Sequence, residues 1–227
     1  MASTNRCTYC GKEFAKARTL QVHLCEPKRR YLQKDEKWVV NAFMVFQRFY
    51  QIHQHNSKLK TYDEFVKSAY YNAFVKFGRF IMHINPLYPE KYIDFVLRSK
   101  IKLDHWARDD LYETYLIEAL KTEPVESALQ RSITTMMDWA TEQNAQWSDY
   151  FRLVNTNRAV QHIQQGKISP WLLLGCSAGK RMLKSFNDEQ LQMIERFINP
   201  SFWPSKLKSY PADHMLVQDT AREAKIV

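Results

Sequence analysis

The stretch "EKWVVNAFMVFQRFYQIHQ", residues 36–54, indicates the fold class of most of the chain. Its large aromatic residues recur with the spacing of one helix face: Trp38, Phe43, Phe46, Phe49 and Tyr50. Apolar residues at this spacing are typical of an amphipathic helix that buries one side. The polar run "HNSK", residues 55–58, then interrupts the pattern. The stretch therefore predicts the first helix of a helical body.

The same helical pattern continues to the C-terminus. Residues 61–85 open with Thr61 and Glu64 in capping-box spacing and close at Asn85, before a proline. Further helix starts are expected at Pro89, Asp104, Pro124, Pro170 and Asn187. No run alternates as a strand does, and no unit of solenoid length repeats. The sequence predicts an all-α body of roughly eight to ten helices over residues 38–227, whose subdomains, if there are two, divide near residues 145–156.

The N-terminal segment "CTYCGKEFAKARTLQVHLC", residues 7–25, has a different pattern. It repeats the spacing of a zinc finger at Cys7, Cys10, Phe14, Leu20 and His23. The two cysteines supply thiolates from a tight turn, Phe14 and Leu20 supply a small apolar core, and His23 supplies a ring nitrogen. Because so short a segment buries little apolar surface, a bound metal must supply most of its folding free energy.

Residues 5–26 resemble the Cys2His2 zinc-finger family, and the resemblance implies a small ββα-like fold around one zinc ion. The sequence departs from the family at the fourth ligand, for which Cys25 is the nearby candidate. On a continuous helix, Cys25 would lie on the opposite face from His23. The residue before a proline tends to leave the helical region, so Pro27 favours unwinding after His23. We predict a Cys3His zinc site formed by Cys7, Cys10, His23 and Cys25.

The formal net charge of +9 points to an acidic partner, of which nucleic acid is the commonest. Residues 1–37 carry nine Lys or Arg against four Asp or Glu, and residues 27–37 are expected to be a basic linker between the finger (residues 1–26) and the body. Phosphate contacts are expected from Lys12, Lys16, Arg18, Lys28, Arg29 and Arg30. In a major-groove docking Val22 would face the bases without a hydrogen-bonding group, so little sequence preference is expected.

An aromatic run within the body, "YYNAFVKFGRF" at residues 70–80, allows two interpretations. Its rings could stack on unpaired bases, with Lys67, Lys76 and Arg79 as secondary contacts to the nucleic-acid backbone. Helical spacing also places Tyr70, Phe74 and Phe77 on one stripe, which is more typical of a protein core. Trp171 and the three leucines after it are likewise expected in the core.

Patterns that suggest an enzyme are weaker than their structural explanations. The segment "GCSAGKR", residues 175–181, has the wrong glycine spacing for a phosphate-binding loop and lacks its hydroxyl residue. The acidic residues of "DHWARDDLYE", residues 104–113, fit helix capping and solvent exposure better than a metal-dependent nuclease. The histidines are scattered and form no recognisable arrangement with a serine and an acid. We therefore expect no enzymatic activity.

The body, over residues 60–212, resembles the helicase-loading proteins of T-even-type bacteriophages. The likeness lies in "YYNAFVKFGRF" followed by "PEKYIDFVLRS" and "LDHW", and in "IQQGKISPWLLL" followed by "FWPSKLKSYPAD". The resemblance implies a bacteriophage protein that binds forked DNA, recruits a replicative helicase and contacts a single-strand-binding protein.

Together these patterns predict a zinc-containing nucleic-acid-binding accessory protein. It would couple DNA, mainly through phosphate, to replication, recombination or transcription machinery such as a helicase, polymerase or single-strand-binding protein. The alternative is a protein-interaction or structural module with a purely structural zinc site. The sequence has no apolar run of membrane-spanning length and no secretory signal, so we expect a soluble intracellular protein without a membrane partner.

Overall fold

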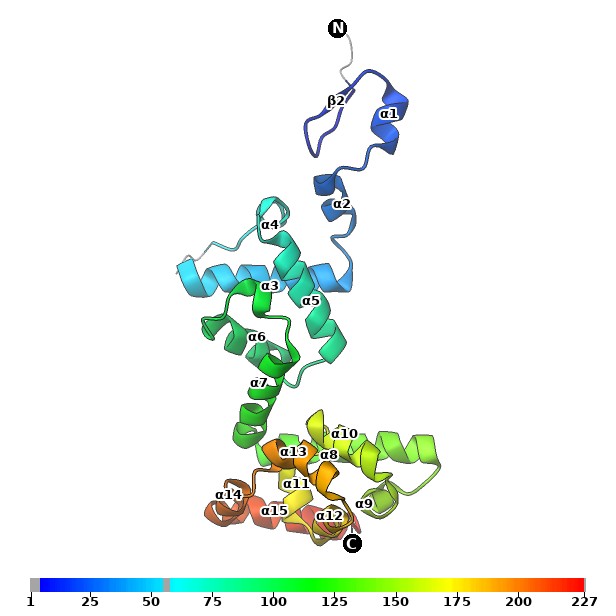
Figure 1. Ribbon diagram of the computed structural model, residues 1–227, viewed down its shortest axis with the longest axis vertical. Coiled ribbons are helices and arrows are strands. Elements are labelled where there is room, and N and C mark those ends of the chain that lie inside the picture. Colours follow the sequence, from blue (N-terminus) through cyan, green and yellow to red (C-terminus); the bar gives the residue numbers. More distant parts are fainter. Residues whose placement is uncertain (1–4, 55–57, 227) are drawn as a thin grey trace. The chain divides into compact units, whose positions relative to one another are not determined.

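The computed structural model describes residues 5–54 and 58–226, so the expected interruption at residues 55–58 lies outside the described residues except for Lys58. The chain forms two compact units, Met1–Tyr112 and Glu113–Val227. Helices make up nearly all the regular structure of both units, and a small two-stranded sheet precedes them at the N-terminus (Figure 1). The predicted all-α body with a small N-terminal ββα-like module is confirmed.

The N-terminal module is built from a hairpin and one short helix. Strands β1 (Asn5–Arg6) and β2 (Glu13–Phe14) pair antiparallel, and helix α1 (Ala17–Val22) follows. The Gly11 amide donates to Cys7 O, and Gly11 adopts a φ of 74°, which glycine tolerates without strain. This turn places the Cys7 and Cys10 side chains on one side of the hairpin.

Most of the expected linker is helical. Helix α2 (Glu26–Leu32) begins directly after Cys25 and has Pro27 in its first turn. It docks on helix α4 (Tyr62–Lys67), because the Arg30 guanidinium donates to Val66 O and the Tyr62 hydroxyl donates to Arg30 O at 2.8 Å. Much of the segment that was expected to be a linker is therefore held against α4. The contacts that hold it cannot be recognised from its composition.

The core of the first unit lies between helices α3 (Lys37–Gln54) and α5 (Tyr71–Ile84). Phe46, Phe65, Phe74 and Phe77 are fully buried there. Gly78 lets the two helices approach closely, since a Cβ at this position would lie 2.9 Å from Ala42 N and closer still to Trp38 O. The capping box between Thr61 and Glu64 is present.

The helix expected over residues 61–85 is divided in two. At Ser68 the backbone becomes extended, with φ −64° and ψ 135°, and α4 ends. The Ser68 hydroxyl accepts a hydrogen bond from the Tyr70 amide at 3.1 Å, and α5 then begins at Tyr71. A local side-chain acceptor of this kind competes with the helical hydrogen-bond ladder, and the residue periodicity does not reveal it.

Helix α6 (Pro89–Arg98) starts at the expected proline, but Asp104 does not cap the next helix as expected. Asp104 lies in a short 3-10 helix, Leu103–His105, and α7 (Asp109–Thr122) begins five residues after it. The physical reason is Trp106, which is buried and whose indole N–H donates to Ile101 O at 2.8 Å. This contact turns the chain before α7 can start.

The second unit is a helical cluster around α8 (Val125–Gln143) and α11 (Pro170–Gly175). It also includes most of α7, from Glu113 onward, and η2 (Trp147–Asp149), α9 (Tyr150–Leu153), α10 (Thr156–Gln164), α12 (Ser177–Lys184), α13 (Asp188–Ile198), α14 (Trp203–Ser209) and α15 (Pro211–Glu223). Trp171, Leu172 and Leu173 are buried as expected, and Leu174 is half-buried. Asn187 caps α13 through a complete capping box.

The chain divides at residues 112 and 113, and not near residues 145–156. Residues 147–153 pack inside the second unit, where the Tyr150 ring lies 5.3 Å from the Trp139 ring of α8. The Tyr150 hydroxyl also lies 2.8 Å from His162 Nδ1. These buried contacts hold the segment that was expected to divide the body against α8 and α10.

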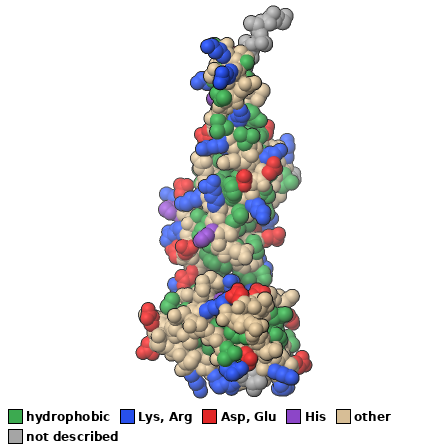
Figure 2. All heavy atoms as spheres, turned by 90° about the vertical axis from the view of Figure 1, so that its right-hand side faces the viewer, with side chains coloured by type: hydrophobic (Ala, Val, Ile, Leu, Met, Phe, Trp, Pro, Cys, Tyr) green, Lys and Arg blue, Asp and Glu red, His purple; other side chains and the backbone are tan. Residues whose placement is uncertain are grey.

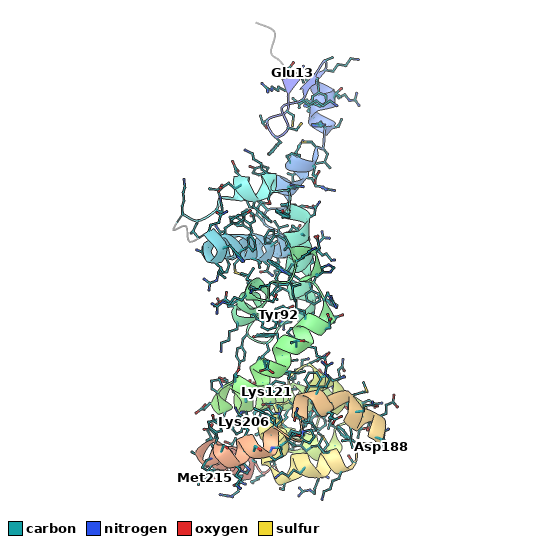
Figure 3. The ribbon with its side chains drawn as sticks, turned by 60° about the vertical axis from the view of Figure 1, so that its left-hand side comes forward. Glu13, Tyr92, Lys121, Asp188, Lys206 and Met215 are labelled. Carbon is teal, nitrogen blue, oxygen red and sulfur yellow. The ribbon has the colours of Figure 1, made fainter. Side chains whose placement is uncertain are left out.

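Polar groups are also built into the interior of the second unit. Glu123 is buried and accepts hydrogen bonds from Arg131 Nη1 at 2.6 Å, Arg131 Nη2 at 2.8 Å and Ser169 Oγ at 3.0 Å. Lys206 Nζ lies 5.1 Å from the ring centroids of Trp171 and Tyr210, and burial lowers the pKa of its amine (Figure 3).

Across the described residues, no helix has both the length and the apolar character needed to cross a lipid bilayer.

Candidate metal centre and basic surfaces

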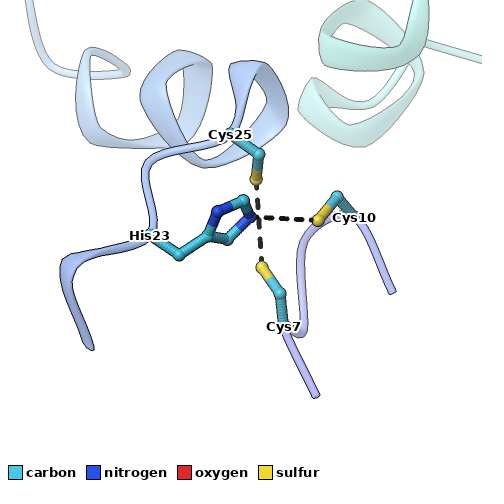
Figure 4. A group of neighbouring side chains, drawn as sticks. All are labelled: Cys7, Cys10, His23 and Cys25. Carbon is cyan, nitrogen blue, oxygen red and sulfur yellow. Dashed lines mark hydrogen bonds between the residues drawn. The ribbon is translucent and has the colours of Figure 1, made fainter. Parts of the chain in front are cut away.

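Four side chains of the N-terminal module converge on one point (Figure 4). The ligand atoms of Cys7, Cys10, His23 and Cys25 all lie within 4.8 Å of one another. Cys7 Sγ lies 3.9 Å from Cys25 Sγ, and Cys10 Sγ lies 3.3 Å from His23 Nε2. Tetrahedral zinc, with bonds of about 2.3 Å to sulfur and about 2.1 Å to nitrogen, separates its ligands by roughly 3.6 to 3.8 Å. The four side chains can therefore hold a metal ion of zinc's size.

Unwinding of the chain after α1 brings Cys25 to the same side as His23. Helix α1 ends at His23, whose ψ of 119° is extended, and Cys25 is also extended, with φ −81° and ψ 162°. Cys25 then precedes the first residue of α2. The expected break after His23 is present and removes the geometric objection to Cys25 as a ligand, but Pro27 does not explain it in the expected way, because the residue before the proline, Glu26, is the first residue of α2.

The surroundings of the four side chains support their orientation. The Phe14 ring packs on the His23 ring with centroids 4.6 Å apart, and Lys28 Nζ donates to His23 O at 3.0 Å. A hydrogen bond from the Cys10 amide is the largest influence on the pKa of the Cys7 thiol and lowers it. Desolvation raises the pKa of the Cys25 thiol. Metal binding requires both as thiolates, so a bound cation would have to overcome the second effect.

The donor set also indicates what kind of site this is. Three thiolates and one imidazole suit zinc and not magnesium or calcium, which prefer oxygen ligands. With four protein ligands, tetrahedral zinc has no open position for water or substrate. The arrangement can therefore stabilise the module but offers no place for metal-assisted chemistry. Within the described residues, no other group of three or more Cys, His, Asp or Glu could hold a metal ion.

The predicted phosphate-contacting residues near the finger fall into two groups. Lys12, Lys16, Arg18 and Arg29 are exposed. Lys28 is half-buried, and its amine is held by His23 O. Arg30 has a side chain that is only 14% exposed; it bonds Glu26 and Val66 O, and its guanidinium carbon lies 4.3 Å from the Tyr71 ring centroid. The structure thus uses Arg30 to anchor α2, which takes its guanidinium away from an external phosphate.

The predicted secondary residues Lys67, Lys76 and Arg79 are exposed on α4 and α5. The aromatic run beside them is mostly core, because Tyr71, Phe74 and Phe77 are buried. Tyr70 departs from its predicted apolar stripe and is 60% exposed. The stacking interpretation therefore reduces to this one well-exposed ring.

The two units differ in charge, which was not apparent before the division of the chain was known. The first unit carries 20 Lys or Arg against 11 Asp or Glu, and the second carries 13 against 13. The whole formal excess of nine positive charges therefore belongs to residues 1–112. Figure 2 shows Lys and Arg side chains distributed over the face of the molecule that it presents.

The other sequence patterns have structural explanations. Gly179 lies at the junction of α11 and α12, where a Cβ would meet the Leu173 backbone, and its amide donates to Cys176 Sγ at 3.4 Å. Asp110 pairs with Arg108, which lowers the pKa of the Asp110 carboxyl. Glu113 pairs with Arg196 at 2.7 Å. These side chains are engaged within the protein and do not converge on a common point.

Comparisons with known proteins do not extend this description. No protein-family model matches the sequence, and neither curated proteins nor solved structures provide a match. The functional argument therefore rests on this chain alone, which has a zinc-finger-like hairpin and helix with a Cys3His group at the N-terminus of an all-α protein.

Proposed function

We propose that this protein is a nucleic-acid-binding accessory protein, of the bacteriophage kind that its sequence resembles. Its first unit holds DNA through the phosphate backbone, and its helical body engages a larger machine such as a helicase, a polymerase or a single-strand-binding protein. The observation that carries the proposal is the charge distribution, since all nine excess positive charges belong to the first unit. Such a concentration attracts a polyanion and releases its counterions.

The finger contributes basic side chains that are available to phosphate. Lys12, Lys16 and Arg18 are exposed, and none of them forms an ion pair within the described part of the chain. Val22, at a position that would face the bases in a major groove, is 76% exposed and apolar. Contacts between basic side chains and phosphate position a protein on nucleic acid but carry little sequence information.

Zinc has a structural role in this proposal. The hairpin and α1 bury few side chains, so metal binding supplies the free energy that keeps the basic residues in a fixed arrangement. The ion takes part in no reaction, and none of the described side chains is assigned a catalytic role.

The test combines zinc quantification with DNA binding at low and high salt, on the wild type and on Cys10→Ser. Cys176→Ser is the matched control, because this buried cysteine lies outside the site and serine keeps an acceptor for the Gly179 amide. We expect one zinc per chain and salt-sensitive binding in the wild type and the control. Cys10→Ser should lose zinc and weaken binding. A wild type that holds zinc yet binds neither DNA nor RNA at low salt contradicts the proposal.

One observation favours a second candidate, in which the finger contacts protein. Val22 and Leu24 are 76% and 60% exposed, close together in the sequence at the end of α1. Exposed apolar side chains beside a structural metal site are suited to a protein partner. Assembly that needs zinc, proceeds without nucleic acid and resists high salt would favour this candidate.

A further inference from the structure

Most of the positive charge of the first unit lies outside the finger. Residues 5–25 carry four Lys or Arg against one Asp or Glu, an excess of three. Residues 26–84 carry eleven against five, an excess of six. Residues 85–112 carry five against five. The segment from the start of α2 to the end of α5 therefore holds twice the excess charge of the zinc-binding module.

Part of this charge gathers where α2 meets α4 and α5. The Arg30 guanidinium reaches Val66 O at the end of α4 and packs over Tyr71 at the start of α5. Exposed Arg29 and exposed Lys67 are the chain neighbours of Arg30 and Val66, so this contact brings their backbones together. The docking of α2 thus brings the charge of Arg29 close to that of Lys67 at the end of α4.

Helix α5 continues the basic surface away from the junction. Lys76 and Arg79 lie three residues apart on its exposed side, while Phe74, Phe77 and Ile81 face the core. The Arg79 guanidinium lies 5.4 Å from the ring centroid of Trp38, which holds it near the surface without an acidic partner. Burial raises the pKa of Tyr71, and the charges of Arg30, Arg29 and Arg79 oppose this shift.

Acidic groups near the junction are largely engaged. Glu26 pairs with Arg30, and Asp63 accepts a hydrogen bond from the Tyr31 hydroxyl. Asp35 is exposed, and its charge only adds to the rise in the pKa of Tyr62 that burial and the neighbouring tyrosines mainly cause. Lys67, Lys76 and Arg79 have no ion pair in the described part of the chain. Their charges are therefore available to an external anion.

We propose that Arg29, Lys67, Lys76 and Arg79 form a second phosphate-contacting surface for nucleic acid, separate from the finger. We call these four residues the junction surface. The inference rests on the proposed function and deepens it, because it assigns the nucleic acid two contact regions in one unit. Each phosphate that a basic side chain neutralises contributes about 0.7 to 0.9 to the slope of log affinity against log salt.

The test measures that slope with a mixed-sequence DNA oligonucleotide, as a single strand and as a duplex. The junction variant is Lys67→Gln, Lys76→Gln and Arg79→Gln, which leaves α2 and the finger unchanged. The finger variant is Lys12→Gln, Lys16→Gln and Arg18→Gln. The matched control is Lys91→Gln, Lys100→Gln and Lys102→Gln, which removes three exposed charges from the segment without excess charge. A further variant, Lys67→Arg, Lys76→Arg and Arg79→Lys, keeps the charge.

The junction and finger variants should each reduce the magnitude of the slope by about 2 to 3, and the charge-keeping variant and the control should leave it unchanged. A junction variant that behaves like the control, while the finger variant loses salt dependence, overturns the junction surface and leaves the proposed function standing. A wild type without salt-dependent DNA binding overturns both. Far-ultraviolet circular dichroism verifies the fold, and loss of binding in the charge-keeping variant contradicts a phosphate role.

Discussion

Cys7 Sγ and Cys25 Sγ lie 3.9 Å apart, although Cys7 lies in the turn of the hairpin and Cys25 directly precedes α2. This distance fits two thiolates on one tetrahedral zinc ion. Cys25 is thus the last residue of the metal site, and it also directly precedes α2, the helix that docks on the body. The metal site and the start of α2 are therefore set by the same residue.

Cys25→Ser tests this fourth ligand. Loss of a residue that only hydrogen-bonds a metal ligand costs about 10- to 100-fold in metal affinity, so loss of a thiolate that binds the metal directly should cost at least tenfold. Competition with a chromophoric chelator measures the affinity, and Cys176→Ser is the control outside the site. Equal affinities in Cys25→Ser and the wild type would show that the chain binds zinc through three ligands.

The spacing of Cys7, Cys10 and His23 is enough to predict the metal site, because metal geometry restricts which residues can serve. The need for a break after His23 also follows from the spacing, although the residue before Pro27, Glu26, is helical and the break lies at His23 to Cys25. Helical periodicity predicts the all-α body for a similar reason, since an amphipathic helix must bury one face. Both predictions depend on local spacing, which the sequence records directly.

Tertiary contacts account for what the sequence does not predict. Arg30 looks like its neighbour Arg29 in the sequence, and only the docking of α2 on α4 separates their roles. A division of the body near residues 145–156 is expected from the sequence, yet Tyr150 of this segment packs on Trp139 of α8. The junction of basic residues from α2, α4 and α5 likewise has no sequence pattern, because its members are brought together only by folding.

Gly78→Ala should destabilise the first unit. A Cβ at this position would lie 2.9 Å from Ala42 N and nearer still to the Trp38 backbone, and backbone atoms cannot move aside as a side chain can. Overpacking of this kind costs about 1 to 3 kcal/mol, which outweighs the gain of up to about 1 kcal/mol in helix propensity. Chemical denaturation measures the difference, with Asn72→Ala at an exposed position of α5 as the control. A Gly78→Ala protein as stable as the wild type contradicts the close packing.

His162 should make the second unit less stable in mild acid. Burial lowers the pKa of His162 to about 4 from the ordinary histidine value of 6.5, and the charges of Lys167 and Arg158 add to this effect while Glu142 opposes it. Below the unfolded-state pKa, the unfolded chain binds a proton that the folded chain resists. Stability should therefore fall by about 3 kcal/mol as the pH drops from 6.5 to 4.

The measurement is chemical denaturation across this pH range on the wild type and His162→Gln. The variant lacks the titrating ring, so its stability should fall by about 3 kcal/mol less than that of the wild type between pH 6.5 and 4. This comparison does not depend on how stable the variant is at pH 6.5. Parallel curves for the two proteins would assign the acid sensitivity to other groups.

Arg131→Met should strongly destabilise the second unit. The Glu123 side chain is fully buried, and the substitution removes the two charge-assisted hydrogen bonds that Arg131 donates to it, while the hydrogen bond from Ser169 remains. Breaking a buried pair from one side costs about 3 to 5 kcal/mol. Arg152→Met is the matched control, because Arg152 pairs with Asp149 in a more exposed position and such pairs contribute about 0 to 1 kcal/mol. Similar losses in the two variants would contradict the assigned role of Glu123.

Arg29 and Arg30 are adjacent in the sequence, and substituting each by glutamine should have opposite consequences. Arg30→Gln removes the guanidinium that reaches Val66 O and packs on Tyr71, so the first unit should lose about 1 to 3 kcal/mol of stability. Arg29 is exposed, so Arg29→Gln should leave stability within about 0.5 kcal/mol.

DNA binding should separate the same two residues in the other direction. Under conditions where both variants are folded, Arg29→Gln should reduce the magnitude of the salt slope by nearly 1, and Arg30→Gln should change it little because Arg30 is already occupied within the protein. Thermal unfolding and a salt titration on each variant give the four values needed. Loss of salt dependence on Arg30→Gln with unchanged stability would reverse the two roles, because it would mean that Arg30 leaves Val66 to contact phosphate.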